Sequence, residues 1–72
     1  MTDLKMQFGH RLAEIRKKKG VTQEALAAGA GCSVRTIADI EAGKHGPRFD
    51  LLQRIAGHLQ CPVKTLFDFP DT

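Results

Sequence analysis

Apolar residues near the start of the chain recur at spacings of four, four and three positions, at Leu4, Phe8, Leu12 and Ile15. Such spacing draws one apolar stripe down a helix, because positions three and four apart share a helical face. Three lysines at positions 17–19 and then Gly20 follow the stripe. Cations suit the negative end of a helix and glycine ends it, so the pattern predicts a first helix that stops at this run.

A second helix is predicted to begin after Thr22, whose hydroxyl can accept a hydrogen bond from a free amide of the first turn. Val21 before this cap and Leu26 after it have the spacing of a hydrophobic staple. Gly29 and Gly31 follow, and glycine readily adopts the positive-φ backbone with which helices end. The second helix is therefore expected to stop at these glycines.

Ser33 is the predicted cap of a third helix, which Gly43 would end, and Cys32 and Ile37 form a second staple around the cap. The turn between the two capped helices is then only about four residues long and contains glycine, as in a helix-turn-helix motif, here over about residues 22–42. If Ile37 and Ile40 face inward, the helical rotation directs Arg35, Asp39 and Ala42 outward, with Val34 and Ala38 on one flank.

Two further helices are predicted beyond the turn at residues 44–48, which contains Gly46 and Pro47. The apolar positions of the fourth helix are Phe49, Leu52, Ile55, Ala56 and Leu59, and those of a short fifth helix after Pro62 are Val63, Leu66 and Phe67. The sequence therefore predicts an all-α fold, a compact single domain of five short helices across residues 1–72.

The size and charge of the chain limit the classes of function that it can have. In a chain of 72 residues only about 60% of the unfolded surface can be buried, which leaves little room for an enzyme cleft. The net charge of +3 is unevenly distributed, because residues 1–48 carry +4 and residues 49–72 carry −1. This balance favours a polyanionic partner that meets the basic part of the chain. The chain has no Trp or Tyr, which argues against a binder of single-stranded nucleic acid, since that function needs aromatic stacking surfaces.

Cys32 and Cys61 are far apart, and no signal peptide is expected from the first residues, so a disulfide framework is not indicated. Both cysteines are expected to be buried packing residues. No apolar run approaches the ~18 residues that a membrane span needs, so no membrane partner is expected. The expected location is the reducing cytoplasm.

The residue patterns of catalysis and metal binding are missing from the sequence. No nucleophile with a base, paired carboxylates or phosphate loop can be identified. The three histidines have no ligand spacing with either cysteine, at His10, His45 and His58. We therefore expect a protein that is not an enzyme and that uses no metal or cofactor.

Several of these motifs occur together in a pattern that a known family shares. In order, they are Leu12, Ile15-Arg16, the run Thr22-Gln23-Glu24-x-Leu26-Ala27-x-x-Ala30-Gly31, the run Ser33-x-x-Thr36-Ile37-x-x-Ile40-Glu41-x-Gly43, then Pro47, Leu52, Ile55-Ala56 and Leu59. With this spacing, residues 9–67 resemble the lambda-repressor and Cro type of helix-turn-helix domain, often called the XRE family. The resemblance implies a sequence-specific transcription regulator, most simply a repressor, that inserts the helix beginning near Ser33 into the major groove of double-stranded DNA.

The outward residues at the start of that helix are then the candidates for reading bases: Val34, Arg35, Ala38 and Asp39. Arg35 can bond O6 and N7 of guanine bidentately, and Val34 can press on a thymine methyl group. Asp39 has two interpretations of equal weight. It either accepts a hydrogen bond from a cytosine amino group or pairs with Arg35 one turn away and orients it.

The resemblance also implies contacts with the DNA backbone and one structural ion pair. The phosphate-binding candidates are Gln23, Ser33, Thr36, Lys44, His45 and Arg48. A solvated glutamine at position 23 and an ordinary basic surface loop at residues 44–48 are the plainer alternatives. Arg48 stands where the family commonly has a small polar helix cap. Arg16 and Glu41 are implied to pair and so to fix the angle of the third helix.

One such domain contacts only a short half-site, so useful specificity suggests a homodimer on its DNA operator. The candidates for the dimer contact are Val63, Leu66, Phe67 and Phe69, although Val63 and Leu66 fit the core of one chain equally well. Two other functions stay open. One is an antitoxin-type or restriction-controller regulator, and the other is a protein-interaction module that keeps this fold.

Overall fold

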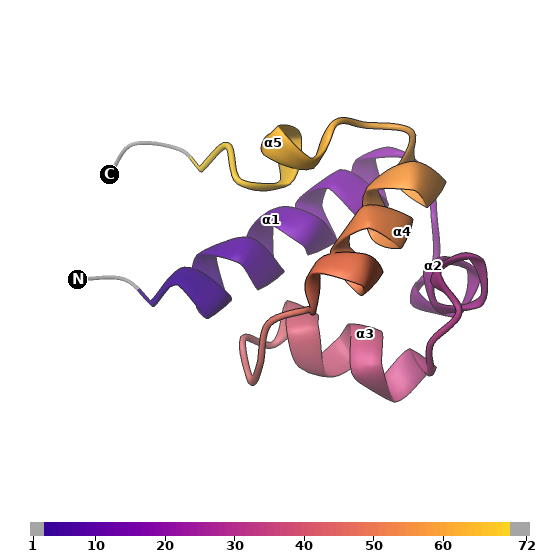
Figure 1. Cartoon of the computed structure of the whole chain (residues 1–72), viewed down its shortest axis with the longest axis horizontal. Helices are drawn as coiled ribbons and strands as arrows, with labels where there is room; N and C mark the ends of the chain where they lie inside the picture. The colour runs from indigo at the N-terminus through magenta and orange to yellow at the C-terminus, as the bar shows by residue number, and fades with distance from the viewer. Residues whose placement is uncertain (1–2, 70–72) are drawn as a thin grey trace.

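The computed structural model describes residues 3–69, so the first two and last three positions of the predicted domain lie outside the described residues. Over this range the chain forms helices and no strand, in the order α1 (Leu4–Lys18), α2 (Gln23–Ala30), α3 (Val34–Glu41), α4 (Phe49–Leu59) and α5 (Val63–Leu66) (Figure 1). The predicted all-α fold of five short helices is confirmed. Within the same residues, no helix is both long enough and apolar enough to span a membrane.

The helix ends follow local chemistry. The hydroxyl of Thr22 accepts a hydrogen bond of 3.0 Å from the backbone N–H of Ala25, and the hydroxyl of Ser33 accepts one of 3.1 Å from Thr36. Both predicted caps are therefore present. Gly31 ends α2 in the left-handed conformation, with φ of 72°. Gly29, which we also expected in the turn, lies inside α2, because a single left-handed residue is enough to end the helix.

The core is apolar and receives side chains from all five helices, namely Phe8, Leu12, Ile15, Leu26, Ala27, Ala30, Ile37, Ile40, Leu52, Ile55, Ala56, Leu59 and Leu66. In α1 and α4, two expected core positions are wrong, because Leu4 is 56% exposed and Phe49 is 88% exposed. Each is the first residue of its helix and lies one turn before the first buried position. The cysteines were expected to be buried, but Cys32 and Cys61 are only partly buried, packed against the edge of the core.

The packing of the helices leaves one side of α3 uncovered. α1 packs against α3 and α5, and α2 packs against α3 and α4. In Figure 1, α1 crosses the middle of the molecule, with α5 on one side and α3 on the other. Because α1 and α2 together cover the inner side of α3, its buried residues are Ile37 and Ile40, whereas Val34 and Arg35 are exposed on its outer side.

Gly9 lies at a close approach between α1 and the end of α3. This buried glycine lies in the middle of α1, and a Cβ atom there would overlap the backbone carbonyl oxygen of Ile40 and meet that of Glu41 at 2.8 Å. A residue without a side chain is therefore required for α1 to touch the end of α3. The close contact fixes how α3 is seated on the rest of the domain.

We predict that Gly9→Ala lowers the free energy of unfolding by about 1–3 kcal/mol, because the added methyl group would push α3 away from α1. Urea denaturation followed by circular dichroism measures this change. The matched control is Gly57→Ala in α4, where nothing lies within 4 Å of the position that a Cβ would take. That control should gain up to about 1 kcal/mol, since alanine favours a helix more than glycine does. Equal stability of the two variants would contradict the close approach.

Candidate nucleic-acid interface

The first turns of α3 carry the candidate base-reading residues on the uncovered side of the helix. Val34 and Arg35 are exposed, and the Arg35 side chain is 82% accessible. Ala38 and Asp39 lie one turn later on the same face and are half-buried. Because these positions are one and four residues apart, they form a short, continuous surface along one side of the helix.

Asp39 faces Arg35 across one turn of α3. The Nε atom of Arg35 lies 3.4 Å from Oδ2 of Asp39, so the two side chains form a long hydrogen bond and an ion pair. The pairing with Arg35 that the spacing allows is thus present in this structure. The contact uses Nε, so it leaves unused the outer N–H bonds of the two terminal nitrogens, which form the far end of the guanidinium group.

Residues 44–48, which we call the basic turn, leave α3 at a left-handed glycine. Gly43 has φ of 77°, and the backbone N–H of Lys44 donates a 3.0 Å hydrogen bond to the carbonyl oxygen of Asp39. The side chains of Lys44, His45 and Arg48 are exposed. Arg48 precedes α4 without a side-chain hydrogen bond to cap it. The basic turn therefore places three basic side chains beside the end of the exposed face of α3.

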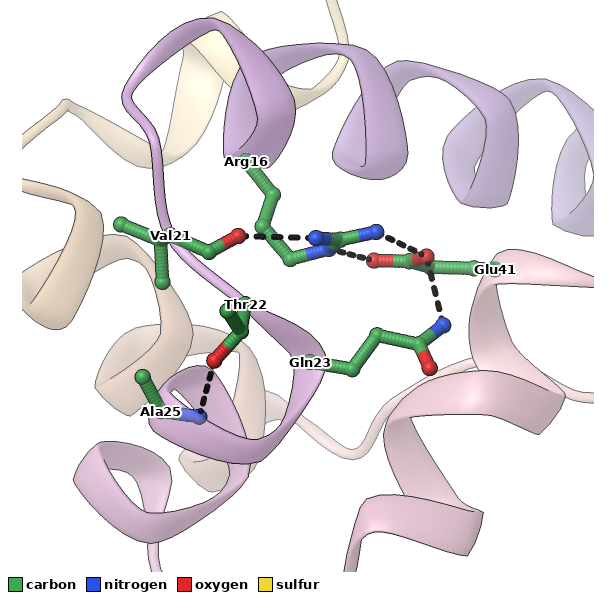
Figure 2. Close-up of polar contacts among 6 residues, drawn as sticks. All are labelled: Arg16, Val21, Thr22, Gln23, Ala25 and Glu41. Atoms are coloured by element: carbon green, nitrogen blue, oxygen red, sulfur yellow. Dashed lines mark hydrogen bonds and ion pairs between the residues drawn. The ribbon is translucent and has the colours of Figure 1, made fainter.

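The remaining phosphate-binding candidates have partners inside the protein. The hydroxyls of Ser33 and Thr36 lie 2.9 Å apart, and Ser33 also caps α3. The side-chain amide of Gln23 donates a 3.0 Å hydrogen bond to Oε1 of Glu41 (Figure 2). No local pattern in the sequence indicates this contact, because the two residues are 18 positions apart. Gln23 is thus tied to the framework that holds α3.

Arg16 is the centre of that framework. Its Nε donates to Oε2 of Glu41 at 2.7 Å, its Nη2 to Oε1 at 3.1 Å, and its Nη1 to the carbonyl oxygen of Val21 at 2.7 Å. The hydrogen bond with Glu41 raises the pKa of Arg16 above its ordinary value. The two side chains are only 10% and 8% exposed. The pair implied by the resemblance is therefore nearly enclosed, and it joins α1, the loop before α2 and the end of α3 (Figure 2).

A second long-range contact, which sequence reasoning missed, holds α2 against α4. Nε of Arg54 donates a 2.7 Å hydrogen bond to the carbonyl oxygen of Ala30, the last residue of α2. Arg54 also borders a hollow of about 320 Å³ between α3 and α4, together with Cys32 and Thr36. Burial raises the pKa of the Cys32 thiol, which disfavours the reactive thiolate form.

The candidates for a dimer contact divide between the core and the surface. Leu66 is fully buried and closes the core of its own chain, so it is unavailable to a second copy. Val63 and Phe67 are exposed, and Phe69 is half-buried. The Phe67 ring stacks at a tilt on Phe8, with 5.0 Å between ring centres, and lies 6.1 Å from Phe69. An apolar surface of Val63, Phe67 and Phe69 therefore remains around α5.

Comparisons with known proteins agree with this architecture. A family model described as helix-turn-helix matches residues 12–66. An uncharacterized HTH-type transcriptional regulator of Archaeoglobus fulgidus is 39% identical, over 85% of this chain and 87% of its own length. The immunity repressor protein of Bacillus phage phi105 is 36% identical over 85% of this chain, which spans only 42% of that protein.

A similar solved structure is the crystal structure of the restriction-modification controller protein C.AhdI from Aeromonas hydrophila. It superposes with a TM-score of 0.85 at 30% identity, over 88% of this chain and 96% of that chain. The likeness therefore covers nearly the whole of both chains.

We predict that Glu41→Ala lowers the free energy of unfolding by about 3 kcal/mol, because it leaves the nearly enclosed Arg16 charge without its carboxylate. Thermal and urea unfolding measure the loss. Glu14→Ala is the matched control, since Glu14 also pairs with an arginine, Arg11, at 2.8 Å, but on the surface. An exposed pair contributes about 0.5 kcal/mol or less. Unfolding of Glu41→Ala at the parent's temperature would contradict a structural role for the buried pair.

Proposed function

The chain belongs to the helix-turn-helix family and is a DNA-binding transcription regulator, and we propose that it reads its operator by placing α3 in the major groove of duplex DNA. The observation that carries this proposal is the exposed Arg35 face on a helix whose opposite side is fixed to α1 and α2. The major groove is about 12 Å wide and admits one α-helix. A helix held rigidly from behind can enter it without rearrangement of the domain.

Base reading is assigned to Val34, Arg35 and Ala38, with Asp39 in support. The two terminal nitrogens of Arg35 are free to donate to O6 and N7 of a guanine, which is the commonest specific contact in the major groove. Val34 and Ala38 are small apolar groups suited to a thymine methyl group. The proposed sequence preference therefore depends mainly on one guanine and the bases next to it.

Backbone contacts are assigned to the two edges of this face. Lys44, His45 and Arg48 of the basic turn lie beyond the end of α3, and their exposure suits contacts with phosphates on one side of the groove. Gln23, Ser33 and Thr36 lie toward the other edge, at the starts of α2 and α3, where helix N-termini attract phosphate. These contacts position the protein without reading sequence.

We propose repression as the direction of regulation, which the likeness to the phage immunity repressor supports. A restriction-modification controller is a second candidate, favoured by one observation. The chain superposes on C.AhdI over nearly the full length of both proteins, whereas it spans less than half of the phage repressor. Both functions use the same DNA-reading surface, so the assignment of residues is the same for either.

We further propose that two copies bind one operator as a homodimer through the apolar surface of Val63, Phe67 and Phe69. This surface is on the α5 side of α1, away from α3, so a second copy bound there leaves the DNA-reading face free (Figure 1). Two copies would then read half-sites about 34 Å apart or a multiple of this distance.

Selection of binding sites from random duplex DNA tests the reading surface. We expect the parent to select one motif, and Arg35→Ala to lose preference at a single base pair at a cost of about 1–3 kcal/mol of binding free energy. Lys44→Ala should weaken binding to all sequences about equally, because a phosphate contact carries no sequence information. If Arg35→Ala and the parent select the same motif, Arg35 does not read a base.

The proposed dimer is tested by sedimentation equilibrium with and without operator DNA. We expect Val63→Glu to raise the dissociation constant of the dimer by about tenfold or more, since it would bury an unpaired charge between the two copies. Gln53→Glu, an equal gain of negative charge at an exposed position of α4, should leave the dimer unchanged. A parent that is monomeric in both conditions would exclude the dimer.

A further inference from the structure

Asp39 faces basic side chains from two separate parts of the interface. On α3 itself, Nε of Arg35 lies 3.4 Å from Oδ2. From the basic turn, Nζ of Lys44 lies 3.9 Å from Oδ1, and Nε2 of His45 lies 4.0 Å from Oδ2. Among the described residues, one carboxylate thus serves both the proposed base-reading side chain and the proposed phosphate-binding side chains.

These contacts are loose enough to be exchanged. The Asp39 side chain is 21% exposed, whereas the Arg35, Lys44 and His45 side chains are 82%, 66% and 53% exposed. Only the contact with Arg35 is short enough for a hydrogen bond. The backbone hydrogen bond from Lys44 to the carbonyl oxygen of Asp39 nevertheless keeps the basic turn beside the carboxylate. The side chains can therefore change partners while their backbones stay in place.

On this basis, and resting on the proposed function, we propose that Asp39 sets the ratio of specific to non-specific DNA binding. It does so by acting on Lys44, which contributes to binding of any sequence, and on Arg35, which reads a base. On any duplex, Lys44 must leave the carboxylate to reach a phosphate, so Asp39 weakens the attraction that every sequence shares. Once Lys44 and His45 of the basic turn are on phosphates, the carboxylate is left to Arg35. It then fixes the plane of the guanidinium group and leaves the two terminal nitrogens free for a guanine.

Asp39 is in this view a positioning residue, which acts on the base through Arg35. This differs from the alternative in which its carboxylate accepts a hydrogen bond from a cytosine. It also differs from a carboxylate that only repels nearby phosphates, because simple repulsion does not depend on Lys44. The three roles predict different couplings among Asp39, Arg35 and Lys44.

The experiment is a pair of double-mutant cycles on the full chain, with Asp39→Asn combined with Lys44→Gln and, separately, with Arg35→Ala. Two quantities are measured for each protein by fluorescence anisotropy. One is the affinity for random-sequence duplex DNA, and the other is the discrimination between the selected operator and the same operator changed at the base pair that Arg35 reads. Lys64→Gln on α5 is the control for loss of a positive charge elsewhere. Melting temperatures establish that each variant is folded.

We expect Asp39→Asn to raise the affinity for random duplex by about threefold, the size of an exposed ion pair, and to lower discrimination by about tenfold. The gain in affinity should disappear in the Lys44→Gln background and persist in the Lys64→Gln background. The loss of discrimination should disappear in the Arg35→Ala background, because Asp39 then has no side chain to orient.

Three outcomes would overturn the inference. Unchanged discrimination in Asp39→Asn would show that Arg35 needs no positioning. If Asp39→Asn loses the same amount of discrimination with and without Arg35, Asp39 reads a base directly. An equal gain in random-duplex affinity with and without Lys44 would reduce Asp39 to simple repulsion. Each requires a parent that binds and selects duplex DNA, whereas a parent that binds no duplex contradicts the proposed function itself.

Discussion

The buried ion pair between Arg16 and Glu41 is the interaction on which the placement of α3 depends. One guanidinium group holds the end of α1, the loop at Val21 and the last residue of α3, and Gln23 adds the start of α2 through the same carboxylate. Removing two charges from water is costly, and only well-formed hydrogen bonds offset that cost. Here the carboxylate accepts three such bonds, so the pair holds four segments in one arrangement instead of merely adding to their stability.

Gly9 and the front of α3 complete this arrangement from opposite sides. Behind α3, the missing side chain of Gly9 lets α1 reach the carbonyl groups of Ile40 and Glu41, so the helix is held by both backbone and side chains. In front, Arg35 and Asp39 meet only through a long, exposed contact. A rigid helix with adjustable side chains suits a groove reader, because the backbone must already be aimed while the side chains adapt to the bases.

The sequence predicted what depends on neighbours along the chain. The caps at Thr22 and Ser33 and the left-handed Gly31 are local features, and all three were identified correctly. The first residues of helices were misjudged at Leu4 and Phe49, since periodicity says which face is apolar and not where the core ends. Three contacts join distant parts of the chain: that of Gly9 with the end of α3, that of Gln23 with Glu41, and that of Arg54 with Ala30. No local pattern in the sequence predicts them. The Arg16–Glu41 pair was expected only through the family resemblance.

The charged side chains include a buried pair that holds the framework and an exposed set beside α3. The buried charges, Arg16 and Glu41, neutralise each other, so they contribute little to the field outside the protein. The positive side chains that remain free to act on a polyanion include those of the basic turn, which are exposed beside α3. Asp39 is the acidic group set among them. A regulator must leave wrong sequences as well as hold the right one, and in our proposal a single carboxylate between the proposed base-reading and phosphate-binding side chains limits the attraction that all sequences share.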